Sequence, residues 1–105
     1  DSVVVASHDY NQSLNSKLAQ LEGTQALDAI FCAHTHQLVN SSIQRADGKN
    51  ISVVQNGDKN DTAMGVELIY TNGEYSSFKN TIYQQIIKIK ISHRPSGPWL
   101  CLFLL

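Results

Sequence analysis

Charge is scarce in this sequence, and neither sign dominates. Among the 105 residues, eight lysines and arginines face nine aspartates and glutamates, which gives a net charge of −1 and a pI near 6.4. Proteins that bind nucleic-acid polymers or anionic membrane surfaces usually carry an excess of positive charge on one face. We therefore expect neither a nucleic-acid polymer nor a membrane as a partner.

Long apolar runs and cysteines are also few. The longest apolar run is the seven-residue segment 99–105, whereas a helix needs about 20 residues to cross a bilayer. Cys32 lies within an earlier apolar run and Cys101 lies in the distant tail, so two free thiols are expected rather than a bridge. The sequence thus predicts no membrane span and no disulfide framework.

The residues that are present suit one globular domain, with 42% hydrophobic content. One apolar run covers 2–6, and a second begins at Leu27 and ends at a histidine pair. Between them, the segment 11–21 has leucines at helical spacing, Asn11 or Ser13 as possible N-caps, and Gly23 just past its end. These leucines are Leu14, Leu18 and Leu21. The order predicts a βαβ unit with parallel strands.

The later part of the chain reads as hairpins. Segments 38–45 and 51–55 flank the turn dipeptide Asp47-Gly48, and the alternating segment 66–70 is followed by Asn72-Gly73 and a returning strand through Tyr75 and Phe78. Segment 87–91 alternates as an edge strand would. We therefore predict an α/β fold: a partial α/β sandwich in which one βαβ unit is followed by mainly antiparallel strands and hairpins.

Histidines follow both strands of the predicted βαβ unit. His8 comes after the first strand, and His34 and His36 come after the second. The carboxyl ends of parallel strands meet at one edge of a sheet, where open α/β sheets bind ligands, so the three rings should converge. Imidazole suits Zn²⁺, Fe, Mn²⁺ or Ni²⁺ better than Ca²⁺ or Mg²⁺. The pattern predicts metal ligands at all three positions; the alternative is an ordinary surface loop.

Segments 3–8 and 28–36 together resemble the last two metal motifs of the calcineurin-like metallophosphoesterases. In that superfamily a lone His ends one strand, and a G-H-x-H motif ends the next. Segments 52–57 and 64–70 are similar to the strand, glycine loop and strand that follow this motif in the 5'-nucleotidase branch. Here Ala33 replaces the usual Gly, so a slightly shifted loop is expected.

The resemblance covers about residues 1 to 80 and has faded by residue 85. Residues 1–85 are accordingly assigned to the carboxyl-terminal part of such a catalytic domain, and 86–105 to a tail without an assigned role. The chain also begins on a core strand without an initiator Met. We therefore expect a fragment of a larger domain, whose amino-terminal half is the missing partner.

The resemblance implies two divalent metal ions, drawn from Zn, Mn, Fe, Co and Ni, which this chain ligates only in part. His8 and His34 would contribute to one ion and His36 to the other. The implied reaction is hydrolysis of a phosphate ester or nucleotide by metal-activated water at this dinuclear centre. A periplasmic or extracellular location is implied as well.

Three family motifs, D-x-H, G-D-x-x-D and G-N-H, would lie before residue 1. By the resemblance they hold the bridging carboxylate and the transition-state histidine, so no catalytic residue is assigned here. Weak metal binding and negligible hydrolysis are expected of the isolated chain. The segment 57–61 matches G-D-x-x-D in letters but follows the H-x-H motif, and it is interpreted as a turn-rich loop.

Two other classes stay open. An amidohydrolase-type metallohydrolase also has an H-x-H at the end of a strand, but further histidines should follow, and only His93 does. A non-catalytic module could use its histidines for packing or for structural metal binding.

Half of a sandwich would leave one set of apolar sheet faces without its partner layer, which predicts marginal stability or self-association. Separately, four asparagines begin N-x-S/T sequons, and chance accounts for them in a chain rich in Asn and Ser. These are Asn11, Asn40, Asn50 and Asn60.

Overall fold

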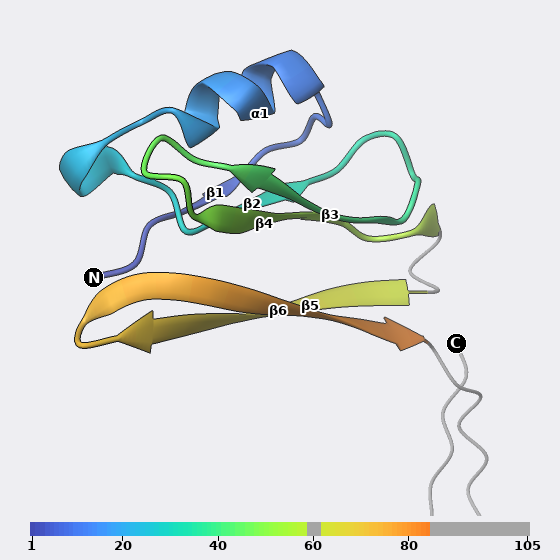
Figure 1. Ribbon diagram of the computed structural model, residues 1–105. Coiled ribbons are helices and arrows are strands. Elements are labelled where there is room, and N and C mark those ends of the chain that lie inside the picture. The colour runs from blue at the N-terminus through green and yellow to red at the C-terminus, as the bar shows by residue number, and fades with distance from the viewer. Residues whose placement is uncertain (59–61, 85–105) are drawn as a thin grey trace, which may run out of the picture.

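The computed structural model describes residues 1–58 and 62–84. The elements follow one another as β1 (Val4–Ala6), α1 (Gln12–Ala19), a 3-10 helix (Gly23–Gln25), β2 (Ala29–Cys32), β3 (Val39–Gln44), β4 (Asn50–Gln55), β5 (Thr62–Thr71) and β6 (Glu74–Gln84). Figure 1 shows a four-stranded sheet between α1 on one side and the β5–β6 hairpin on the other. This confirms the expected partial α/β fold. The expected edge strand at 87–91 and the tail 86–105 lie outside the described residues, as do Asn60, His93 and Cys101.

The βαβ unit forms as predicted. β1 and β2 are parallel, with Val4 opposite Ala29 and Ala6 opposite Phe31. Of the two possible N-caps, Asn11 is the one used, because its side-chain oxygen accepts a hydrogen bond from the backbone N–H of Leu14 at 3.0 Å. This bond satisfies one of the amides that a helix start leaves unpaired.

Replacing Asn11 with Ala should lower the free energy of unfolding by about 1 kcal/mol, because the first turn of α1 loses its side-chain acceptor. Urea denaturation followed by circular dichroism measures the change. Ser13→Ala is the matched control: Ser13 is exposed, and its substitution should change stability by less than about 0.5 kcal/mol. Equal losses for the two variants would contradict the assignment of the cap.

The leucines whose spacing predicted the helix are not the residues that it buries. Leu14 and Leu21 are 40% and 37% exposed. The buried positions of the helix are Asn15 and Ala19, with Leu18 packed beside the core. Leu21 is not on the helix at all, because α1 ends at Ala19. The 3-10 turn that follows starts at Gly23, whose φ of +65° favours glycine.

β4 is the most buried strand of the molecule's described part. It forms an antiparallel hairpin with β3, as predicted, with Ser42 opposite Ser52. It also pairs with β2 in parallel and thereby lies between β2 and β3, giving the order β1-β2-β4-β3. The residues from Ile51 to Gln55 are buried without interruption, which is typical of a strand covered on both faces.

The β5–β6 hairpin supplies the second cover. Its turn is Asn72-Gly73, as predicted, and both residues have positive φ, at 53° and 80°, which suits a tight two-residue connection. The hairpin contacts the sheet through Asn80, whose side chain is bonded to Ser52 of β4 at 2.6 Å and to Asn40 of β3 at 2.9 Å.

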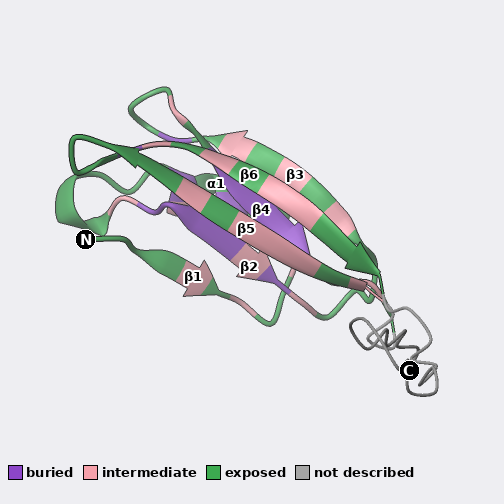
Figure 2. Cartoon of the chain, turned by 90° about the horizontal axis from the view of Figure 1, so that it is seen from below, coloured by how far each residue is buried: buried purple, intermediate pink, exposed green. Residues whose placement is uncertain are grey.

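This cover changes one expectation. The predicted uncovered sheet face is not found at β2 and β4, because the hairpin lies in front of them (Figure 2). It is found at β1, which lies to the side of the hairpin and leaves Val4 50% exposed. Self-association stays a prediction, with β1 as the exposed edge of the sheet.

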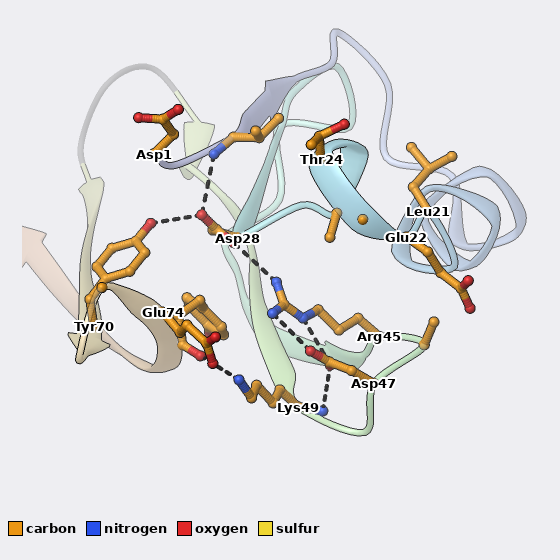
Figure 3. A pocket seen from close by; sticks show the side chains of 16 residues that line it. Asp1, Leu21, Glu22, Thr24, Asp28, Arg45, Asp47, Lys49, Tyr70 and Glu74 are labelled. Atoms are coloured by element: carbon orange, nitrogen blue, oxygen red, sulfur yellow. Dashed lines mark hydrogen bonds and ion pairs between the residues drawn. The ribbon is translucent and has the colours of Figure 1, made fainter.

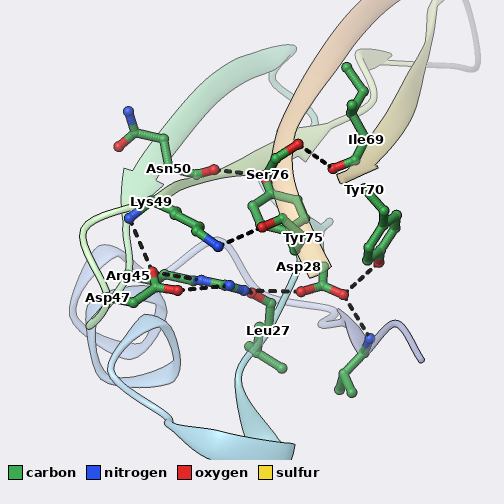
Figure 4. A network of polar contacts seen from close by, with 11 residues as sticks. Leu27, Asp28, Arg45, Asp47, Lys49, Asn50, Ile69, Tyr70, Tyr75 and Ser76 are labelled. Atoms are coloured by element: carbon green, nitrogen blue, oxygen red, sulfur yellow. Dashed lines mark hydrogen bonds and ion pairs between the residues drawn. The ribbon is translucent and has the colours of Figure 1, made fainter. Parts of the chain in front are cut away.

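A buried ion pair lies at the amino-terminal end of β2 and connects the four-stranded sheet to the β5–β6 hairpin. Asp28 precedes β2 and Arg45 follows β3; their side chains are 7% and 9% exposed, with 3.0 Å between Oδ1 and the guanidinium. Arg45 also donates to the Leu27 carbonyl at 2.9 Å and to both carboxylate oxygens of Asp47 at 2.9 Å (Figure 4). Tyr70 of β5 donates to Asp28 at 2.7 Å, so the hairpin is tied directly to this pair.

Tyr75 of β6 closes the same network. Its ring lies 4.7 Å from the guanidinium carbon of Arg45, and its hydroxyl donates to the Asn50 carbonyl at 2.6 Å. Lys49 donates in turn to the backbone carbonyl of Tyr75 at 2.7 Å. Burial raises the pKa of Tyr75 to about 12, so its hydroxyl stays protonated through the neutral range.

Candidate metal centre

Three parallel strands end at one edge of the sheet. β1, β2 and β4 run in the same direction, so their carboxyl ends, at Ala6, Cys32 and Gln55, share this edge. His8 follows the first of them, and the segment 34–36 follows the second. The topology therefore places the predicted ligands where α/β sheets present their binding groups.

His8 and His34 come together at this edge. Nε2 of His8 lies 3.4 Å from Nδ1 of His34, and the ring centroids are 5.2 Å apart with 69° between the planes. A backbone hydrogen bond from Ser7 to the Phe31 carbonyl, at 2.7 Å, holds the two strand ends side by side. The predicted convergence of these two rings, 26 residues apart in sequence, is thus present.

His36 makes a different contact. Its Nδ1 lies 3.4 Å from Oδ1 of Asp58, and the two side chains are 73% and 52% exposed. Within residues 1–58 and 62–84, no three side chains of His, Cys, Asp or Glu are close enough together to form a metal site. The structure therefore gives two couples, His8 with His34 and His36 with Asp58, in place of one cluster of three rings.

The backbone of the H-x-H loop is unusual. His34 has φ of 86° and His36 has φ of 61°, in the left-handed region that residues other than glycine rarely adopt. Each such conformation costs about 1–3 kcal/mol, persists only where its surroundings enforce it, and occurs most often at functional sites. Ala33 has no positive φ, so the position where the resembled motif has Gly does not require glycine here.

Cys32 is not available as a ligand. Its side chain is buried and forms no bridge within the part of the chain that the structure describes. It receives a weak hydrogen bond from the Asn15 amide at 3.8 Å on the helix side of the sheet. Burial raises the pKa of the Cys32 thiol, and a thiol must lose its proton to bind a metal. The candidate ligands at this edge are the histidine nitrogens.

The spacing of the two nitrogens fits a bound ion. Zinc–imidazole bonds of about 2.0–2.1 Å at a tetrahedral angle place two bound nitrogens about 3.3–3.4 Å apart. The His8 and His34 nitrogens are 3.4 Å apart, longer than the usual 2.9–3.0 Å hydrogen bond that involves a nitrogen donor. The residues present therefore suit a divalent metal of the zinc type, with two protein ligands from this chain.

Two residues at this edge were not recognised from the sequence as part of the site. Gln55, at the end of β4, hydrogen-bonds the H-x-H loop, and only its place at the end of an apolar strand could have indicated it. Asp58 belongs to the segment 57–61, which was interpreted as a turn. The backbone N–H of Gly57 donates to the Thr62 hydroxyl at 2.8 Å, and residues 59–61 lie outside the described part.

A cavity of about 580 Å³ lies at the other end of the sheet (Figure 3). Its wall includes Asp28, Arg45 and Tyr70 of the buried network, together with Glu22 and Glu74. Since Asp28 precedes β2 whereas His34 follows it, this cavity is not part of the histidine edge.

Comparisons with protein-family models, with curated proteins and with solved structures found no match for this chain. Among the residues described, no helix has both the length and the apolar character needed to cross a bilayer.

Proposed function

We propose that this chain contributes His8, His34 and His36 to the dinuclear metal centre of a phosphoester hydrolase of the 5'-nucleotidase-like kind. The observation that carries the proposal is the 3.4 Å separation of the His8 and His34 ring nitrogens at the shared edge of β1 and β2. The two left-handed histidines of the loop add support, because strain of this sort is usually retained for a purpose.

Each histidine has a separate task in this proposal. His8 presents Nε2 and His34 presents Nδ1 toward one ion. At His36, the Asp58 carboxylate lies beside Nδ1 and favours the tautomer with the proton there, which leaves Nε2 for the second ion. When bound, such ions polarise a phosphoryl oxygen and lower the pKa of a bound water. The substrate is a phosphate ester or nucleotide.

Metal binding by the chain itself gives the first test. Titration with Co²⁺, followed by visible absorption and calorimetry, should show binding that His34→Ala weakens at least about tenfold, because half of the ligand pair is lost. His93→Ala is the matched histidine control, because His93 belongs to neither motif, and it should bind as the unsubstituted chain does. Equal Co²⁺ affinity of the unsubstituted chain and His34→Ala would overturn the proposed site.

Hydrolysis needs a second test. A longer chain that carries D-x-H, G-D-x-x-D and N-H motifs upstream of Asp1 should hydrolyse bis(p-nitrophenyl) phosphate or a nucleotide with Mn²⁺, Zn²⁺ or Co²⁺. The 105-residue chain should not, because it supplies only part of the ligand set. Inactivity of the longer chain with every metal would favour the non-catalytic metal-binding module instead.

A further inference from the structure

Gln55 places a buried amide beside the exposed H-x-H loop. Gln55 is the last residue of β4 and lies opposite Cys32 of β2; it is only 3% exposed. The amide nitrogen donates to the hydroxyl of Thr35 and to the backbone carbonyl of Gln37. Because a carbonyl oxygen only accepts, the contact with Gln37 fixes the NH₂ group toward the loop.

The two residues that Gln55 contacts are direct chain neighbours of the loop histidines. Thr35 lies between His34 and His36, and Gln37 follows immediately. Both histidines have positive φ, at 86° and 61°, so the loop needs an external restraint to keep this backbone. The Thr35 hydroxyl also accepts a long hydrogen bond, 3.4 Å, from the backbone N–H of Gln37. Gln55 is the buried side chain that bonds both residues.

The oxygen of the Gln55 amide is buried and, among residues 1–58 and 62–84, has no hydrogen-bond partner. A buried acceptor without a partner is unfavourable for folding. An apolar residue of the same size would avoid this loss, while Thr35 and Gln37 are exposed and could bond water instead. The amide therefore does not favour core stability, whereas its two hydrogen bonds restrain the H-x-H loop.

We propose that Gln55 is a positioning residue that holds the H-x-H loop in the conformation in which His34 meets His8. This inference rests on the proposed metal-binding role of these histidines. Gln55 touches no ion or substrate and acts through the backbone of the loop. Partners of this indirect kind typically change metal affinity by about 10- to 100-fold when they are removed.

The test compares Gln55→Leu with Gln44→Leu in the 105-residue chain. Gln44 is the matched control because its amide nitrogen also donates to a loop carbonyl, that of Gly48 at 3.2 Å, at the opposite end of the sheet. Gln55→Leu should remove the nuclear Overhauser contact between the His8 and His34 rings and weaken Co²⁺ binding about tenfold. Gln44→Leu should change neither, and the melting temperature of Gln55→Leu should fall by less than about 4 °C.

The outcomes separate the inference from the function on which it rests. Retention of the ring contact and of the Co²⁺ affinity in Gln55→Leu would overturn the positioning role. A second outcome combines two results: the unsubstituted chain binds no Co²⁺, and Gln55→Leu still loses the ring contact. This outcome would support the positioning role and overturn the metal site. Gln55→Met gives a second variant of similar size: its thioether has no donor for the Gln37 carbonyl, so it should lose the contact as well.

Discussion

Arg45→Met should lower the free energy of unfolding by about 3–5 kcal/mol, the loss usually found when one partner of a buried ion pair is removed. The Asp28 carboxylate is 7% exposed, and among the described residues it would keep only the Tyr70 hydroxyl and the backbone N–H of Val3 as partners. A buried charge without a counter-charge is strongly unfavourable. Urea denaturation at neutral pH measures the change. Lys79→Met, on the exposed face of β6, should lose less than about 1 kcal/mol.

A double substitution shows whether the loss comes from the pair. Asp28→Asn removes the buried charge but keeps an oxygen that can accept from Tyr70. Arg45→Met combined with Asp28→Asn should therefore be clearly more stable than the sum of the single losses predicts, with an interaction energy of about 1–3 kcal/mol. Strict additivity would show that the two side chains do not act as a buried pair.

Alkaline pH should destabilise the chain through Tyr75. Its pKa in the folded state is raised to about 12, mainly by burial, whereas an unfolded tyrosine titrates near pH 10. Because the folded state holds the proton more tightly, the contribution is fully present below pH 10 and is lost as the pH rises toward about 12. A shift of this size corresponds to at most about 2.7 kcal/mol. Unfolding free energies measured from pH 8 to 12 should fall across this window.

Substitution of the tyrosines assigns the effect. Tyr75→Phe removes the bond to Asn50 and lowers stability at every pH, but it should flatten the decline above pH 10. Tyr70, whose pKa burial also raises, contributes to the slope that remains. Tyr83→Phe, at a position 59% exposed, should keep the full decline. An unchanged slope in Tyr75→Phe would contradict the role given to burial.

The parts of the fold that local chemistry controls could be predicted from the sequence. Asp47-Gly48 and Asn72-Gly73 indicated both hairpins, because these residues tolerate the backbone that tight turns require. The meeting of His8 with His34 followed from strand direction alone, since a helical crossover makes the two strands parallel. The contact of His36 with Asp58 did not follow, because it depends on how the loop after β4 folds back.

The parts that depend on packing could not be predicted. The hairpin of β4 with β3 was predicted, but its parallel pairing with β2 was not. That second neighbour is a tertiary choice, because a buried run suits several positions in a sheet. The inward face of α1 includes Asn15, a polar residue that apolar periodicity passes over. Gln55 was missed for the same reason, because a glutamine at the end of a strand usually faces water.

The insertion of β4 between β2 and β3 has a consequence for how the molecule matures. β2 and β4 are adjacent in the sheet, yet all of β3 separates them along the chain. During synthesis the two loop histidines therefore emerge before the strand that carries Gln55, so under the proposed positioning role a nascent chain lacking β4 does not yet hold their loop. Under the proposed metal site, an ion that binds the finished arrangement stabilises that state alone, and cobalt absorption during refolding should rise only when β4 has docked between β2 and β3.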